Sequence, residues 1–170
     1  MITKSDQTRA LSLSTFTFTV CFTIWTIFSI LGLQIKQELN LNDTQFGILV
    51  ATPILTGALS RLILGIWTDQ YGGRIVMFLT MVLSAISTYL LSSIETYGMF
   101  LVAALGVGLA GGTFAVGITY VSAWYKKEKQ GTVLGIFGVG NVGAALTNFG
   151  APFIMLALDW QGLAKTYAII

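Results

Sequence analysis

Arg61 is the residue of this sequence whose type and position point most directly to a chemical role. It lies within a long apolar segment, and Asp69 is the next charged residue along the chain. In a helix, Arg61 lies about 12 Å from the Asp69 end of that segment. A guanidinium at such a depth in hydrocarbon costs at least about 2.5–3.5 kcal/mol, so it normally faces a cavity and has a partner. Its planar fork of donors suits a flat or tetrahedral oxyanion.

The apolar segments themselves hold no acidic partner for Arg61. All seven carboxylates of the chain lie in the connecting segments or near its ends. The guanidinium can therefore pair with a carboxylate outside these residues, extend toward the membrane surface, or bind an anionic substrate. We favour the substrate, because the surface is reached from this depth only by a strained side chain.

Two stripes of small and polar residues are predicted to form the walls of such a site. Around Arg61, the residues Pro53, Gly57, Gly65 and Thr68 recur at steps of three or four, so they share its helix face. The second stripe comprises Gly131, Gly135, Gly138, Asn141, Ala145, Asn148 and Pro152. Asn141 lies about 15 Å into its segment, close to the depth of Arg61, which predicts a shared site at mid-membrane. Ordinary interhelical hydrogen bonding is the alternative, and for Asn148 it is an equally good interpretation.

Two glycine-rich stretches, Gly106–Gly111 and Gly138–Gly143, match the G-x-G-x-x-G fingerprint of dinucleotide-binding proteins. That fingerprint requires a preceding strand, a following helix start and an acidic residue about 20 positions later. Both stretches lie inside long apolar segments instead, so nucleotide binding is excluded. We expect these glycines, including the pairs Gly108/Gly112 and Gly131/Gly135, to allow close helix packing.

The composition defines the elements that must position these residues. Only 9% of the residues are charged, 55% are hydrophobic and the mean hydropathy is +0.80, whereas soluble domains carry about 25% charged residues. This excludes a disordered chain, a nucleic-acid binder and an ordinary cytosolic enzyme. The chain has no His and a single Cys, Cys21. Disulfide frameworks, Cys/His metal sites and His-based catalysis are thereby excluded, and no cofactor is expected.

The chain is predicted to be an all-α membrane protein, because a membrane helix needs roughly 20 apolar residues. Five segments qualify, at about 10–33, 44–67, 75–94, 98–124 and 131–158. The first is too long for the apolar core of a secretory signal. Asp159–Ile170 is expected to be a loop and the start of a sixth helix, so we expect residues 1–170 to be one bundle from the front half of a longer protein.

The basic residues predict the orientation of these helices. With the N-terminus in the cytoplasm, one group of loops carries most of the positive charge, from Lys4, Arg9, Arg74, Lys126, Lys127 and Lys129. Only Lys36 and Lys165 lie on the other side. The positive-inside rule therefore places the N-terminus in the cytoplasm of a protein of the cell (inner) membrane.

The loop between the second and third spans resembles a motif of the major facilitator superfamily. It has Gly65, Asp69, Gly72 and Arg74 at matching positions and departs from the motif at Gln70 and Gly73. Further stretches are similar to the nitrate/nitrite porters of that superfamily. These are Gly106–Gly117 in the fourth span, Gly135–Gly143 in the fifth, and Trp25-Thr-Ile-Phe28-Ser29 in the first.

The resemblance implies a fold and a set of site residues. The fold is the N-terminal half of a two-halved transporter, with five full transmembrane helices and the start of a sixth. The resemblance makes Arg61 the nitrate-binding arginine of this half, with Asn141 as the nearby amide. Phe114 and Phe28 would enclose the anion, and Gly111, three residues before Phe114, would belong to the same binding site. A second arginine would come from the absent C-terminal half, so this chain alone should not transport.

Three classes of function compete at this point. The first is transport of nitrate, nitrite or both, by exchange or by proton-coupled uptake. The second is a transporter of the same superfamily for another small organic anion, which would need a wider cavity than the phenylalanines leave. The third, a membrane enzyme or scaffold, is disfavoured because no nucleophile–base pair is present. The expected partners are a small inorganic anion, the lipid bilayer and the C-terminal half, and no nucleic acid.

Overall fold

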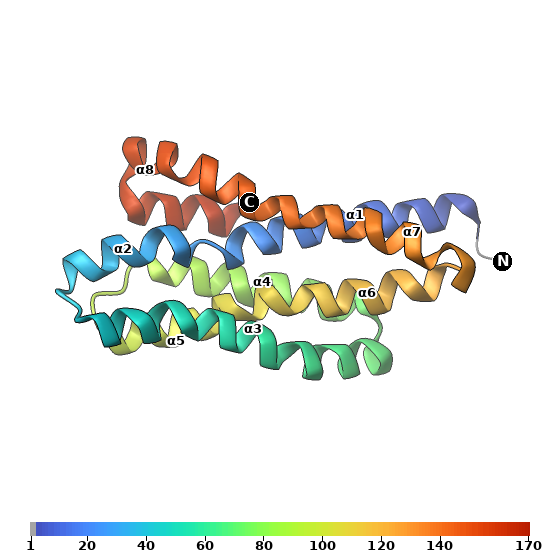
Figure 1. Cartoon of the computed structure of the whole chain (residues 1–170), viewed down its shortest axis with the longest axis horizontal. Helices are drawn as coiled ribbons and strands as arrows, with labels where there is room; N and C mark the ends of the chain where they lie inside the picture. Colours follow the sequence, from blue (N-terminus) through green and yellow to red (C-terminus); the bar gives the residue numbers. More distant parts are fainter. Residues whose placement is uncertain (1–2) are drawn as a thin grey trace.

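The computed structural model describes residues 3–170, and this part of the chain contains only helices and short connections, with no strand. The elements in chain order are α1 (Lys4–Trp25), α2 (Phe28–Glu38), α3 (Asp43–Tyr71), α4 (Gly73–Leu91), α5 (Tyr97–Gly108), η1 (Leu109–Gly112), α6 (Thr113–Trp124), α7 (Lys127–Gly138), η2 (Val139–Asn141) and α8 (Val142–Ile169). They form one elongated bundle (Figure 1). The all-helical fold expected from the sequence is confirmed.

Five helical units of the described chain are long and apolar enough to cross a membrane. They are Lys4–Glu38, Asp43–Tyr71, Gly73–Leu91, Tyr97–Trp124 and Lys127–Ile169. Three of the five are not continuous α-helices. The first breaks between α1 and α2, and the fourth and fifth each contain a short 3₁₀ turn, η1 and η2 respectively. The third unit ends at Leu91, three residues before the expected end of that span.

The ends of α3 follow from local side-chain chemistry. Asn42 caps its start, because the Asn42 side chain accepts from the amide of Gln45 at 2.8 Å and the Gln45 side chain accepts from the amide of Asn42 at 3.1 Å. The helix stops at Gly72, whose φ of 85° is a conformation that glycine adopts without a Cβ clash. A tight turn into α4 results.

The first unit breaks at Thr26 and Ile27, where the helical hydrogen-bond pattern changes. The amide of Ile27 donates to the carbonyl of Ile24 rather than to that of Thr23. The Thr23 oxygen accepts instead from the hydroxyl of Thr147 on α8, at 2.7 Å, and from the hydroxyl of Thr26, at 3.1 Å. A break inside a membrane helix is tolerated when neighbouring groups satisfy the freed carbonyl in this way.

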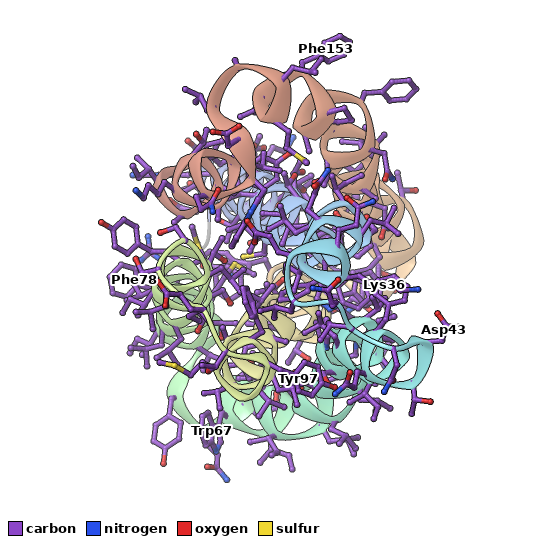
Figure 2. The ribbon with its side chains drawn as sticks, turned by 90° about the vertical axis from the view of Figure 1, so that its left-hand side faces the viewer. Lys36, Asp43, Trp67, Phe78, Tyr97 and Phe153 are labelled. Carbon is purple, nitrogen blue, oxygen red and sulfur yellow. The ribbon has the colours of Figure 1, made fainter. Side chains whose placement is uncertain are left out.

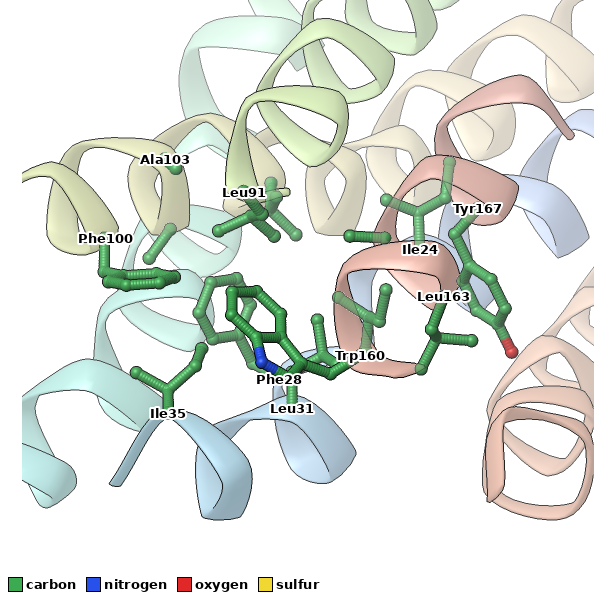
Figure 3. Close-up of a cluster of buried hydrophobic side chains, with 14 of the residues drawn as sticks. Ile24, Phe28, Leu31, Ile35, Leu91, Phe100, Ala103, Trp160, Leu163 and Tyr167 are labelled. Carbon is green, nitrogen blue, oxygen red and sulfur yellow. The ribbon is translucent and has the colours of Figure 1, made fainter. Parts of the chain in front are cut away.

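The last helix reverses direction at Asp159, whose backbone (φ 59°, ψ 178°) is not helical. Residues 160–169 then run back along the bundle, as the red segment of Figure 1 shows. Three of their side chains, Trp160, Leu163 and Tyr167, pack in a buried cluster with Leu91 of α4 and Phe100 of α5 (Figure 3). The expected start of a sixth helix is therefore present and adds to the hydrophobic core.

Large apolar side chains also cover the outside of the bundle. Phe78 on α4 and Phe153 on α8 point away from the helices (Figure 2), and Leu156 is 86% exposed. A water-soluble protein rarely exposes so much contiguous apolar surface. This surface is suited to the hydrocarbon of a bilayer.

Candidate functional site

Arg61 lies on α3, half-buried, and its guanidinium contacts three groups from two other spans. Its Nε donates to the backbone carbonyl of Gly111 in η1 at 3.3 Å. The Cζ atom lies 5.9 Å from the ring centroid of Trp25 on α1 and 5.9 Å from that of Phe114 on α6. Both distances are within the range of cation–π attraction. The sequence-based grouping of Arg61, Gly111 and Phe114 is thus found in the structure.

Glycines of the fourth span allow this approach to α3. A Cβ on Gly108 would lie 2.6 Å from the Cβ of Thr56, and a Cβ on Gly112 would lie 2.5 Å from Leu64 Cδ1. Any larger residue would push α5 and η1 away from α3, and the Gly111 carbonyl would then move out of reach of Arg61. The expected packing role of the pair Gly108/Gly112 agrees with these contacts.

Trp25 lies in a slot between α3 and η1. Its Nε1 donates to the carbonyl of Pro53 at 3.0 Å. A Cβ on Gly57 would lie 2.9 Å from that nitrogen, and a Cβ on Gly111 would lie 2.7 Å from it. The small-residue face of α3 that was predicted to form a wall of the anion site is therefore filled in part by an indole.

The wall behind Phe114 is a cluster of aromatic rings from three spans. The Phe18 ring lies 5.3 Å from those of Phe22 and Phe114 and 4.9 Å from that of Phe137. The Phe22 ring lies 5.2 Å from that of Trp25. Tilted and offset-stacked rings at these separations attract one another. The cluster gives the arginine an aromatic surround on one side.

No carboxylate neutralises Arg61 within residues 3–170. The one ion pair in this part of the chain joins Lys36 of α2 to Asp43 of α3, at the opposite end of α3 from its junction with α4 (Figure 2). Only the Nε of Arg61 has a hydrogen-bond acceptor there. The donors on its two terminal nitrogens are therefore free to bind an anion bidentately.

No hydrogen bond or cation–π contact joins Asn141 or Phe28 to Arg61 in the described residues. The Asn141 side chain, in η2, is exposed and donates to the carbonyl of Gly138 at 2.8 Å. Phe28 is 1% exposed and packs in the hydrophobic cluster with Leu31 and Ile35 of α2 (Figure 3). Their roles in anion binding stay predictions.

The stripe that contains Asn141 faces outward in this chain. Gly131, Gly135, Ala145, Asn148 and Pro152 are exposed as well. The expected close packing at the pair Gly131/Gly135 is wrong here, since a Cβ on either glycine meets no atom within 4 Å. Helical spacing shows which residues share a face, but not whether another helix of the same chain covers that face.

The four residues of the loop motif lie at the junction of α3 and α4. Gly72 makes the turn, Gly65 is half-buried, and Asp69 and Arg74 are exposed. Arg74 also lines a cavity of about 480 Å³, together with Asp6 and Arg9 of α1 and Trp124 of α6. The structural role of this motif stays a prediction.

The sequence alone did not identify Trp25 as a contact of Arg61, and it did not identify Phe18 and Phe22 as part of the aromatic cluster behind Phe114. A signal was present, because Phe18, Phe22 and Trp25 are four and three residues apart and so share one helix face. In an apolar helix rich in aromatic residues, that spacing does not show which face meets Arg61.

The chain is similar in sequence to known proteins. Residues 13–170 match the Major Facilitator Superfamily. A probable nitrate/nitrite antiporter of Thermus thermophilus, NarK1, is 43% identical over 159 residues, which are 94% of this chain and 36% of that protein. A probable nitrate transporter of Staphylococcus aureus strain JH9, NarT, is 34% identical over 160 residues, which are 94% of this chain and 41% of that protein. The chain therefore spans less than half the length of these relatives.

Proposed function

Because this chain belongs to the major facilitator superfamily, we propose that it forms the N-terminal part of a transporter that moves nitrate, nitrite or both across a membrane. Relatives named as nitrate/nitrite antiporter and nitrate transporter support this substrate class. They are longer than this chain, which supports a second set of helices on its C-terminal side. The protein is a multi-pass membrane protein, and its role is that of a transporter rather than an enzyme.

One observation carries the proposal: Arg61 is a cation inside a membrane span without a carboxylate partner in the described chain. Its Nε is held by a backbone carbonyl, and two aromatic rings lie within cation–π distance of its Cζ atom. A guanidinium fixed in this way presents its terminal N–H groups as a flat fork, which matches the planar oxygens of nitrate. Phe114 and the backbone at Gly111 would form the floor of the same site.

The remaining residues of the site would come from surfaces that this chain leaves open. Asn141 lies on an exposed stripe of η2 and α8, where its amide can face a shared central cavity. Phe28 would contact the bound anion only if the first span changes its shape at the break after Trp25. A cationic partner for the second side of the anion would come from the C-terminal part.

Arg61 also bears on how transport is coupled. An empty carrier would bury this cation without a counter-charge, at a cost of several kcal/mol in a low dielectric. The loaded carrier should therefore reorient faster than the empty one, which favours exchange of one anion for another. The expected spans hold no carboxylate and the chain has no His, so proton-coupled uptake would need a titratable group in the C-terminal part.

The protein is proposed to lie in the cell membrane with its N-terminus in the cytoplasm. The basic residues at the end that carries the α3–α4 turn and the α6–α7 connection support this orientation. Accessibility of a single cysteine introduced at Lys127 to a membrane-impermeant reagent, in intact cells and in inverted vesicles, would check it.

Counterflow in liposomes tests the proposed function. The full-length protein, reconstituted in liposomes loaded with nitrate, should accumulate labelled external nitrate, and added nitrite should compete. Liposomes without protein are the control. Counterflow of an organic anion such as lactate, with none of nitrate, would instead assign the protein to the organic-anion transporters. A lack of counterflow with all of these anions would contradict the proposal.

A further inference from the structure

We propose that Trp25 is a positioning residue for Arg61, holding the guanidinium in the orientation that binds a planar anion. The proposal rests on the anion site proposed above and adds a residue of the first span to it. Trp25 acts through the arginine and does not have to touch the anion. Its hydrogen bond, its packing and its contact with the guanidinium each support this role.

The indole of Trp25 is itself held in one place. Its Nε1 donates to the Pro53 carbonyl at 3.0 Å, so the ring is attached to the helix that carries Arg61. Gly57 on one side and Gly111 on the other leave room for it, since a Cβ at either position would come within 3 Å of the indole nitrogen. The Phe22 ring, 5.2 Å away, closes a further side. An indole packed in this way has few alternative rotamers.

The guanidinium needs such a support to keep its plane fixed. A single hydrogen bond from Nε to the Gly111 carbonyl leaves the plane free to swing about that bond. Trp25 from the first span and Phe114 from the fourth, each with its ring centroid 5.9 Å from Cζ, limit the swing by cation–π attraction. A fixed plane aims both terminal nitrogens at two oxygens of one anion, which a swinging plane does not.

A control at a second tryptophan separates the positioning of Arg61 by Trp25 from a simple loss of packing. Trp160 is a buried tryptophan, whereas Trp25 is half-buried, and the Nε1 of Trp160 has no hydrogen-bond partner among residues 3–170. The Trp160 ring lies 6.0 Å from that of Phe100, and no hydrogen bond or cation–π contact joins it to Arg61 in the described residues. Loss of its indole therefore reports the cost of a smaller buried ring without a change at the arginine.

The experiment uses the full-length protein with Trp25→Phe, Trp25→Leu and the control Trp160→Phe. Nitrate dissociation constants are measured by equilibrium binding, and folding is followed by the thermal unfolding midpoint. Proton exchange of the Arg61 Nε–H group is measured by NMR on protein with ¹⁵N-labelled arginine, and the signal is assigned from its loss in Arg61→Lys. Trp25→Leu should raise the nitrate dissociation constant about tenfold and Trp25→Phe by about threefold. Both should speed exchange at Arg61 Nε, and Trp160→Phe should change neither quantity.

Each outcome bears on the proposal. Unchanged nitrate affinity and unchanged Arg61 exchange in the two Trp25 variants would overturn it, even if their unfolding midpoints fall. Where Trp25→Leu does not fold, Trp25→Phe decides by the same two measurements. If the wild-type protein does not bind nitrate, the proposed function fails, and the rate of exchange at Arg61 Nε still shows whether Trp25 positions the arginine.

Discussion

The Nε of Arg61 donates to the backbone carbonyl of Gly111 at 3.3 Å, and this contact joins the second span to the 3₁₀ turn in the fourth. Because the bond uses only one of the guanidinium nitrogens, the terminal nitrogens keep their donors. The turn also places Phe114 beside the same guanidinium. One short glycine-rich segment thus holds the cation and supplies part of its aromatic surround.

Replacing Arg61 by lysine tests whether the shape of the cation matters beyond its charge. We expect Arg61→Lys to lower nitrate exchange at least about tenfold, because an ammonium offers a point charge where the guanidinium offers parallel donors. Exchange is measured as labelled nitrate counterflow in liposomes. Arg9→Lys, at the exposed start of α1, is the matched control. Near-normal exchange in Arg61→Lys would show that Arg61 acts only through its charge or through a structural role.

A methyl group at Gly111 should disturb the slot that Trp25 occupies. The added Cβ of Gly111→Ala would lie 2.7 Å from the indole, and overpacking of this kind costs about 1–3 kcal/mol. Gly131→Ala is the control, because no atom lies within 4 Å of its Cβ position. We expect Gly111→Ala to lower both the thermal unfolding midpoint and nitrate affinity. Equal behaviour of the two variants would contradict the packing described for Trp25.

The hydroxyl of Thr147 should stabilise the break in the first span. Thr147→Val removes the donor to the Thr23 carbonyl, and interhelical hydrogen bonds in membranes contribute about 0.6–1.7 kcal/mol. Thr88→Val is matched in burial, since both threonines are fully buried, but its hydroxyl bonds only within α4, to Ser84. We expect a lower unfolding midpoint for Thr147→Val than for Thr88→Val. The reverse order would mean that Thr147 does not support the break.

Asn141 is predicted to contribute to the anion site once the whole transporter is assembled. Asn141→Ala should raise the KM for nitrate counterflow several-fold, by about the effect of one lost hydrogen bond to a charged group. Asn148→Ala, on the same exposed stripe, is the comparison. An unchanged KM in Asn141→Ala would assign this residue to helix packing or to the bilayer.

Because the charge of Arg61 is not neutralised within residues 3–170, transport should be coupled as an exchange of one anion for another. Efflux of labelled nitrate from liposomes should accelerate when nitrate or nitrite is added outside, because the loaded carrier reorients faster than the empty one. The rate is followed with and without an imposed pH gradient. Efflux that responds to the pH gradient but not to external anion would establish proton coupling and place its titratable group outside this chain.

The sequence alone determined the helical architecture and the position of Arg61 along its span. Hydropathy and helical spacing are properties of short stretches, so they identify five membrane-length units and put Pro53, Gly57 and Arg61 on one face. They also show that the carboxylates lie away from the apolar segments. The family resemblance adds Gly111 and Phe114 to the site, and the structure places both beside Arg61.

Only the tertiary structure determined which helix faces pack against one another. The face of α3 with Gly57 turns inward and receives Trp25. Gly131 and Gly135 are four residues apart, as Gly57 and Arg61 are, and yet they face outward. The break after Trp25 leaves that residue at the arginine, while Phe28 packs with Leu31 and Ile35 of α2. Spacing fixes the angle of a residue around its own helix axis. The rotation of that helix against its neighbours is set by the packing of all the spans together, which no single segment encodes.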